Sequence, residues 1–308
     1  MKDFITYLKQ YLSRQSFKSI LCIIVFTGLL IVCNYTFGIE RRIRDLHPWY
    51  LSLVSFFFFY AFVFFFAWAV VGARDIRSHA SRRHFLLILL SAPLYFSFKM
   101  IHWGMPFHLA YPWDRYALIV LQLPAKLILL CLLLWFCSRM LKEDNKPSPP
   151  LFGLTGKGFR AGPYFVLLAC LLPLIALAST RPDFLHTYPK VKNVAFISGY
   201  TSSVWPWRLL YELSYGLDFL SIELFFRGLL VIGLLRYAGE KAILPMAAFY
   251  CTIHFGKPLG ECISSFFGGM ILGVIALRTR SILGGLIVHL GLAWLMELGG
   301  WLGNLLYF

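Results

Sequence analysis

Residues 221–230 read SIELFFRGLL, and they place Glu223 and Arg227 inside a long apolar run. On a helix, residues four apart lie on the same face, so the carboxylate and the guanidinium are expected to be neighbours. An ionisable side chain at the centre of a bilayer costs at least about 2.5 kcal/mol, so such groups usually face a partner or a wet cavity. The stretch predicts a membrane helix that carries either an internal ion pair or a polar site.

The composition of the whole chain agrees with a membrane class. Of its 308 residues, 59% are hydrophobic and only 14% are charged, whereas soluble domains are about 45–50% apolar and about 25% charged. Several runs reach the roughly 20 apolar residues that cross a bilayer. We therefore expect an all-α, polytopic transmembrane helix bundle of about 8–9 membrane helices, surrounded by lipid. The expected segments lie near 19–38, 50–73, 85–104, 116–138, 163–179, 207–236, 241–255, 261–277 and 282–305.

The net charge of +15 does not indicate a nucleic-acid partner. The Lys and Arg residues lie in short loops between apolar segments, as topology signals do, and the loops on the side of the N-terminus are the more basic ones. We expect an integral, multi-pass protein of a bacterial inner membrane with a cytoplasmic N-terminus. The seven cysteines include no CxxC pair, so the sequence indicates neither a disulfide framework nor a zinc ribbon.

One polar stretch divides the chain. Residues 141–162, LKEDNKPSPPLFGLTGKGFRAG, combine proline, glycine and charge, as linkers do. The predicted division is a set of membrane helices over 1–140, a linker loop over 141–162, and a second membrane domain over 163–308.

Two histidines follow Glu223 in later apolar segments. His254 stands in AAFYCTIHFGKP and His289 in SILGGLIVHLGLAW. At 1.5 Å per residue, Glu223 and His254 lie about 20 Å from the short loop that joins their segments, and His289 lies about 13 Å from the same side. We therefore expect the three side chains to line one buried cavity. The alternative for each histidine is an ordinary hydrogen-bonding residue between helices.

These segments resemble the CAAX protease and bacteriocin-processing (CPBP) family of intramembrane proteases, which includes the type II CAAX prenyl endopeptidases. The family has three motifs, EExxxR, FxxxH and HxxxN or HxxxD. Here they stand as IELFFR at 222–227, YCTIH at 250–254 and HLGLA at 289–293. The resemblance covers a motif core of about 205–300, and it implies a membrane-embedded endopeptidase fold.

The resemblance implies a role for each motif residue that is present. Glu223 corresponds to the second Glu of the first motif, paired with Arg227. His254 and His289 correspond to the two histidines. Two histidines and a carboxylate can also hold a zinc ion, so Glu223, His254 and His289 are candidate ligands of a zinc cofactor.

Two motif residues are replaced. Ile222 stands where the family has the Glu that activates the attacking water together with the first histidine, and Ala293 stands where an Asn helps to stabilise the oxyanion. An alkyl side chain cannot accept a proton from water, and Ala offers no hydrogen-bond donor to an oxyanion. Asp218 lies four residues before Ile222, on the same helical face. It is a candidate replacement for the missing carboxylate.

Three functions follow as hypotheses. The first is an intramembrane endopeptidase that cleaves a membrane protein or peptide, weakened by the two replacements. The second is a catalytically inactive CPBP protein that binds a membrane partner as a scaffold or regulator. The third is a proton-coupled transporter that uses its buried carboxylates and histidines as a relay, although no inverted repeat supports it.

Overall fold

The long apolar runs of the sequence form helices in the computed structural model. It describes residues 2–78, 82–101, 103–104, 109–142, 150–157 and 159–307. Over these residues the chain forms α-helices joined by short 3-10 and π segments, without a strand. Helices satisfy their backbone hydrogen bonds internally, which suits a chain whose surroundings offer none. The all-α fold class is confirmed.

The helices group into two compact units that interleave along the chain. Unit 1 comprises Met1–His102, Leu133–Phe159 and Leu224–Leu283, and unit 2 comprises Trp103–Leu132, Arg160–Glu223 and Gly284–Phe308. Helix α6 (Trp113–Lys142) therefore begins in unit 2 and ends in unit 1. The three-part division of the sequence describes composition along the chain, and it stays a prediction.

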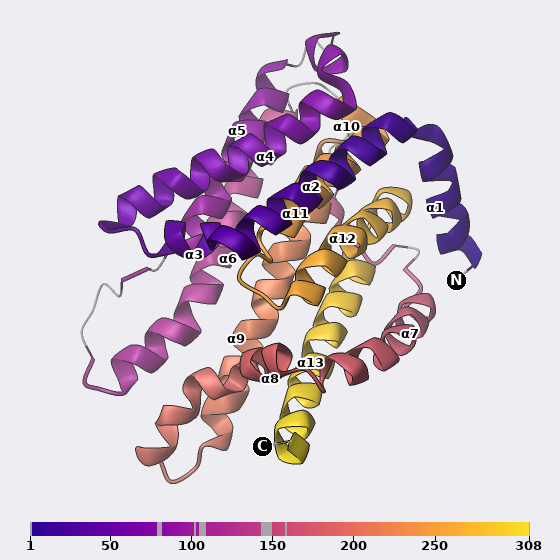
Figure 1. The fold of residues 1–308 in the computed structure, drawn as a ribbon. Coiled ribbons are helices and arrows are strands. Elements are labelled where there is room, and N and C mark those ends of the chain that lie inside the picture. Colours follow the sequence, from indigo (N-terminus) through magenta and orange to yellow (C-terminus); the bar gives the residue numbers. More distant parts are fainter. Residues whose placement is uncertain are drawn as a thin grey trace. The chain divides into compact units, whose positions relative to one another are not determined.

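Unit 1 holds most of the N-terminal helices and the middle of the motif core. Its elements are α1 (Lys2–Arg14), α2 (Phe17–Phe37), α3 (Ile39–Arg44), α4 (Trp49–Ser78), α5 (Arg82–Met100), η1 (Pro150–Gly153), η3 (Leu224–Gly233), α10 (Leu235–Ala238), η4 (Gly239–Ala242), α11 (Ile243–Thr252) and α12 (Leu259–Thr279). Helices α4 and α5 run side by side, and α11 packs against both α4 and α12 (Figure 1). The fully buried Phe249 of α11 lies among the rings of Tyr60, Phe64, Phe96, Phe225 and Phe226. This aromatic cluster joins the N-terminal helices to the motif core.

Unit 2 contains the helix that ends with the first two residues of the first motif and the helix that carries the third motif. Its elements are the first part of α6, α7 (Gly162–Ala178), α8 (Pro182–Thr187), the 3-10 helix η2 (Lys190–Gly199), α9 (Trp205–Glu223) and α13 (Leu283–Tyr307). A small core formed by α6, η2 and α9 contains Tyr116, Val194 and Tyr211. The Tyr116 hydroxyl donates a 2.7 Å hydrogen bond to the Trp207 carbonyl, which fixes α6 against α9.

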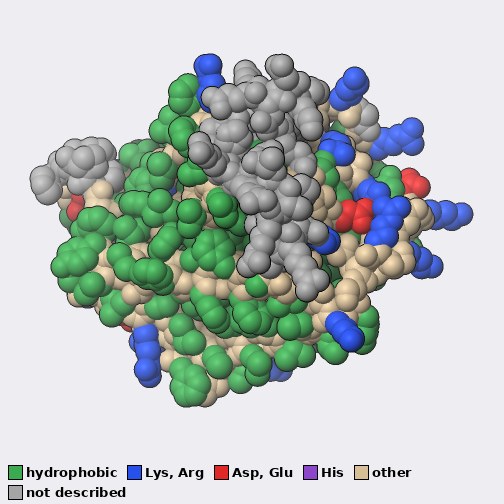
Figure 2. Space-filling view, turned by 90° about the horizontal axis from the view of Figure 1, so that it is seen from above, with side chains coloured by type: hydrophobic (Ala, Val, Ile, Leu, Met, Phe, Trp, Pro, Cys, Tyr) green, Lys and Arg blue, Asp and Glu red, His purple; other side chains and the backbone are tan. Residues whose placement is uncertain are grey.

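Membrane-spanning helices are present in both units. Among the described residues, five helices are long and apolar enough to cross a bilayer: Phe17–Phe37, Trp49–Gly72, Trp113–Arg139, Leu259–Thr279 and Leu283–Leu306. Two shorter apolar helices, Phe85–Met100 and Gly162–Ala178, accompany them. Many large apolar side chains are exposed on these helices, and Figure 2 shows hydrophobic side chains over much of one face, with Lys and Arg projecting from it. The polytopic membrane bundle is confirmed.

The two remaining predicted segments are not continuous helices. The segment expected at 207–236 divides into α9, the π-helix η3 and the short α10, and the segment expected at 241–255 contains the ten-residue α11. A π-helix bonds residues five apart instead of four, and such segments often mark functional sites. The face and depth of residues after Glu223 therefore depart from the α-helical count.

Part of the predicted linker packs inside unit 1. The Gly153 carbonyl accepts a 2.9 Å hydrogen bond from the Ile282 amide, and the Ser281 hydroxyl donates a 2.8 Å bond to the Thr155 carbonyl. Gly153 has φ +88°, and a Cβ there would lie 2.4 Å from Cδ1 of Ile232 in η3. This stretch is thus an integral part of the packing around the π-helix.

We expect Gly153→Ala to destabilise the protein. A left-handed backbone costs a non-glycine residue about 1–2 kcal/mol, and overpacking a tight core costs about 1–3 kcal/mol more. Gly156→Ala is the matched control, because a Cβ at Gly156 meets nothing within 4 Å. Thermal unfolding in detergent measures both variants, and equal midpoints would contradict the packing described for Gly153.

Candidate active site

Glu223 and His289 meet in unit 2. Oε1 of Glu223, the last residue of α9, lies 2.6 Å from Nδ1 of His289 on α13. The Glu223 side chain is fully buried, and the His289 side chain is 12% exposed. A buried carboxylate is tolerated only with a charged or hydrogen-bonding partner, and His289 supplies one across 66 residues of sequence.

Two adjacent glycines make room for this contact. A Cβ on Gly285 would lie 2.2 Å from Oε2 of Glu223, and a Cβ on Gly284 would lie 2.0 Å from the ring of Tyr164. The glycine pair of α13 therefore admits a carboxylate on one side and a tyrosine ring on the other. At these positions side chains of other elements approach the backbone of α13 closely.

The contact involves Nδ1 of His289 and leaves Nε2 for other partners. With Glu223 ionised, its carboxylate only accepts hydrogen bonds, and Nδ1 is then the donor. Proton exchange between His289 and a reacting group would then pass through Nε2. The ring of Phe219 lies 5.9 Å from the imidazole, centroid to centroid, and restricts its tilt. The pair is thus an oriented imidazole backed by a carboxylate, an arrangement that can move a proton or donate to an anion.

Arg227, Tyr250 and His254 form a second group, in unit 1. The fully buried guanidinium of Arg227 lies 4.5 Å from the centroid of the Tyr250 ring, and a desolvated cation–π contact of this kind contributes about 2 kcal/mol. The Tyr250 ring also packs edge-on against His254, with centroids 4.7 Å apart. A Cβ on Gly269 would lie 2.8 Å from Cδ1 of Tyr250, so this glycine of α12 leaves space for the ring.

His254 lies just after its helix. Helix α11 ends at Thr252, and His254 stands in the turn that follows, with its Nδ1 3.0 Å from the Tyr250 carbonyl. It belongs to unit 1, whereas Glu223 and His289 belong to unit 2. The expectation that Glu223, His254 and His289 line one cavity stays a prediction. The ion pair between Glu223 and Arg227 also stays a prediction.

The positions of the two replaced motif residues are buried. Ile222 is 7% exposed on α9 and Ala293 is 4% exposed on α13. Asp218, the candidate substitute for the missing carboxylate, is half-buried, and its Oδ1 lies 3.3 Å from the hydroxyl of Ser221. A hydroxyl can donate to this carboxylate, which gives Asp218 a local partner. Its catalytic role stays a prediction.

The zinc hypothesis receives no support from the geometry. Among the residues that the structure describes, no group of three or more His, Cys, Asp or Glu side chains is arranged to hold a metal ion. The set Glu223, His254 and His289 stays a prediction.

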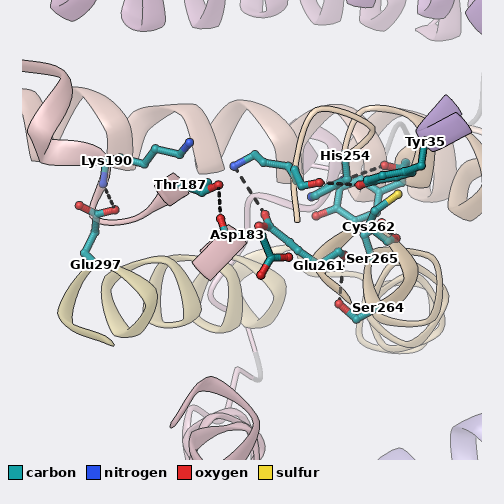
Figure 3. Close-up of polar contacts among 12 residues, drawn as sticks. Tyr35, Asp183, Thr187, Lys190, His254, Glu261, Cys262, Ser264, Ser265 and Glu297 are labelled. Carbon is teal, nitrogen blue, oxygen red and sulfur yellow. Dashed lines mark hydrogen bonds and ion pairs between the residues drawn. The ribbon is translucent and has the colours of Figure 1, made fainter. Parts of the chain in front are cut away.

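A further carboxylate in unit 2 was missed from the sequence. Glu297 of α13 accepts a 2.6 Å backbone hydrogen bond from Lys190 (Figure 3). It accepts a second one, of 3.1 Å, from the amide of Val191. These amides begin η2, where a carboxylate is favoured by the unsatisfied N–H groups. Glu297 therefore anchors the loop before α9. A Glu within an apolar helix was the available signal, as it was for Glu223.

Comparison with known families agrees with the motif core. Residues 203–295 match the family described as Type II CAAX prenyl endopeptidase Rce1-like. This match is consistent with the CPBP resemblance and covers the three motif segments. No curated protein and no solved structure matches the chain.

We expect Gly285→Ala to disturb the Glu223–His289 contact. The added methyl would overlap the Glu223 carboxylate, and overpacking of this kind costs about 1–3 kcal/mol. Nuclear magnetic resonance of labelled histidine rings should show a shifted His289 signal, accompanied by a lower unfolding temperature. Gly268→Ala is the control, because a Cβ there meets nothing within 4 Å. An unchanged His289 signal in Gly285→Ala would refute the close approach.

Proposed function

We propose that this chain, whose residues 203–295 match the Rce1-like type II CAAX prenyl endopeptidases, is an intramembrane endopeptidase-like protein of the CPBP type that hydrolyses peptide bonds slowly. The observation that carries the proposal is the buried contact between Glu223 and His289. It joins residues of the first and third motifs, and a carboxylate-backed imidazole has a direct use in peptide hydrolysis. The membrane helices supply the setting.

The reaction is the addition of water to a peptide carbonyl. The water oxygen bonds to the carbonyl carbon as the proposed substitute base, Asp218, accepts a water proton, and the carbonyl oxygen becomes an oxyanion. The carbonyl then re-forms, and the carbon–nitrogen bond breaks as the protonated base returns that proton to the leaving amine. In the proposed arrangement His254 orients the water. His289, whose Nδ1 contacts Glu223, donates a hydrogen bond to the oxyanion through Nε2 when its ring carries a proton on both nitrogens. This assignment follows the family motifs residue by residue.

The slow rate follows from the two replaced residues. Ile222 cannot accept the proton of the attacking water, and a positioned base contributes about 10²–10⁴-fold. Ala293 cannot donate to the oxyanion, and loss of one such donor costs about 10²–10³-fold. Asp218 is the carboxylate proposed to act as a weak substitute base, because it lies one helical turn before Ile222.

A second candidate function is binding without hydrolysis. The burial of Ile222 and Ala293 favours it, because both positions are filled by apolar side chains that pack rather than react. In this case the protein would hold a membrane segment of a partner as a scaffold or regulator. The proposed ligand in both cases is a membrane protein or peptide, and the proposed location is a bacterial inner membrane with the N-terminus in the cytoplasm.

The deciding experiment restores the replaced residues. Wild type and the double variant Ile222→Glu with Ala293→Asn are reconstituted in liposomes with a library of membrane peptides, and cleavage is followed by mass spectrometry. We expect slow cleavage by wild type and a rise of about 10²-fold or more in the double variant, because a base and an oxyanion donor are regained.

Two further variants separate the candidates. Asp218→Asn should abolish wild-type cleavage if Asp218 is the substitute base, and Glu223→Gln should lower the rate of the double variant by about tenfold or more, because His289 loses its charged partner. Thr27→Val, on a helix without a motif residue, is the control. Peptide binding without cleavage by wild type and the double variant would favour the second candidate. Wild-type cleavage that survives both Asp218→Asn and Glu223→Gln would refute the assigned roles.

A further inference from the structure

The turn that carries His254 is held from outside the motif core. Asn34, near the end of α2, donates a 3.0 Å hydrogen bond from Nδ2 to the carbonyl of Phe255, across 221 residues of sequence. Asn34 is 4% exposed and Phe255 is 3% exposed, so this bond is sheltered from solvent. Both residues belong to unit 1.

The bond satisfies groups that would otherwise be costly to bury. Helix α11 ends at Thr252, and carbonyls at and beyond a helix end lack intrahelical partners. An amide side chain in an apolar helix is likewise unfavourable unless its polar atoms are bonded. The other end of the Asn34 amide accepts a 2.9 Å bond from the backbone N–H of Glu40. Because the amide nitrogen donates one hydrogen bond and the amide oxygen accepts another, the side chain of Asn34 is held in a single orientation.

Two neighbours of Asn34 contact the same turn. The hydroxyl of Tyr35 donates to the carbonyl of Lys257, and Figure 3 shows Tyr35 beside the turn that bears His254. A Cβ on Gly256 would lie 3.2 Å from Oε2 of Glu40, so the turn runs close against this carboxylate. The α2–α3 corner, formed by Asn34, Tyr35 and Glu40, thus contacts three successive residues after His254.

The position of the imidazole depends on this turn. The His254 amide bonds to the Cys251 carbonyl at 3.0 Å, and the His254 carbonyl accepts from the Lys257 amide at 3.0 Å. Phe255 is the next residue in the chain, so a displacement of its carbonyl moves the backbone that carries the ring. A 1 Å displacement of a reacting group can cost about 10²-fold in rate.

We infer that Asn34 is a positioning residue for His254, and that the α2–α3 corner is a working part of the site. The inference rests on the proposed function, in which His254 orients the attacking water. The corner lies outside residues 203–295, the segment that matches the Rce1-like family. The N-terminal helices therefore do more than anchor the motif core in the membrane.

The test compares three variants. Asn34→Leu removes the amide at similar volume. Tyr35→Phe removes only the hydroxyl of a side chain that is 39% exposed, so this variant should fold. It tests the role of the α2–α3 corner even if Asn34→Leu does not fold. Thr27→Val is the matched control. Thr27 is a buried polar residue, 2% exposed, two helical turns earlier on the same face of α2.

Two measurements do not depend on hydrolysis. Hydrogen–deuterium exchange of the amides of residues 253–257 should quicken about fivefold in Asn34→Leu, since a lost hydrogen bond of about 1 kcal/mol changes an opening equilibrium by that factor. The ring signal of His254, assigned by its loss in His254→Gln, should shift in Asn34→Leu and less so in Tyr35→Phe. The His289 signal and the Thr27→Val spectra should stay unchanged.

The third measurement uses the double variant Ile222→Glu with Ala293→Asn. Adding Asn34→Leu should lower kcat by about tenfold with little change in KM, since the substrate still binds and only the reacting geometry is lost. If no variant cleaves, the proposed function fails, and the exchange and ring measurements still decide the position of His254. A His254 signal and exchange rates in Asn34→Leu and Tyr35→Phe equal to those of Thr27→Val would overturn the inference.

Discussion

The carboxylate of Glu223 is fully buried in an apolar helix, and the arrangement of unit 2 around it depends on keeping that charge satisfied. A buried charge without a partner costs several kcal/mol. The 2.6 Å contact with His289 brings the start of α13 to the end of α9. The carboxylate thus has a structural consequence before it has any chemical one, because it holds the third-motif histidine through Nδ1.

Three glycines leave space for side chains that pack closely against the backbone of another element. Gly285 leaves space for the Glu223 carboxylate, Gly269 for the Tyr250 ring, and Gly153 for the Ile232 side chain. In each case a side chain approaches the backbone of another element where a Cβ would overlap it. Small residues at helix interfaces are common in membranes because they permit such close packing. Here they make room for a carboxylate, an aromatic ring and an aliphatic side chain at buried positions.

The motif core packs against segments that lie outside it in the sequence. The aromatic cluster around Phe249 includes rings from α4 and α5, and the turn after α11 is bonded to Asn34 of α2. The stretch around Gly153, expected to be a linker, packs against the π-helix that carries Arg227. A family match limited to residues 203–295 therefore describes the motif residues but leaves out contacts that position them.

The sequence alone determined that the protein is a membrane helix bundle and which residues are candidates for its site. A run of about 20 apolar residues has the length of a membrane helix, and a helix satisfies its backbone hydrogen bonds internally. Polar residues inside such a run stand out because each one is costly to place in a membrane. This is why Glu223, Arg227, His254 and His289 could be singled out, and why the replacements at Ile222 and Ala293 were visible from motif spacing. These features are local, so a linear pattern records them.

The partner of each polar group was decided only by the tertiary structure. The π-helix begins at Leu224, directly after Glu223, and the guanidinium of Arg227 lies over the ring of Tyr250, a contact that no spacing in the sequence indicated. Glu223 bonds to a residue 66 positions away, and Asn34 to one 221 positions away. Helical periodicity determines which side chains share a face of one helix. Which helix packs against that face depends on the fit of whole surfaces, and no spacing within a single segment records it.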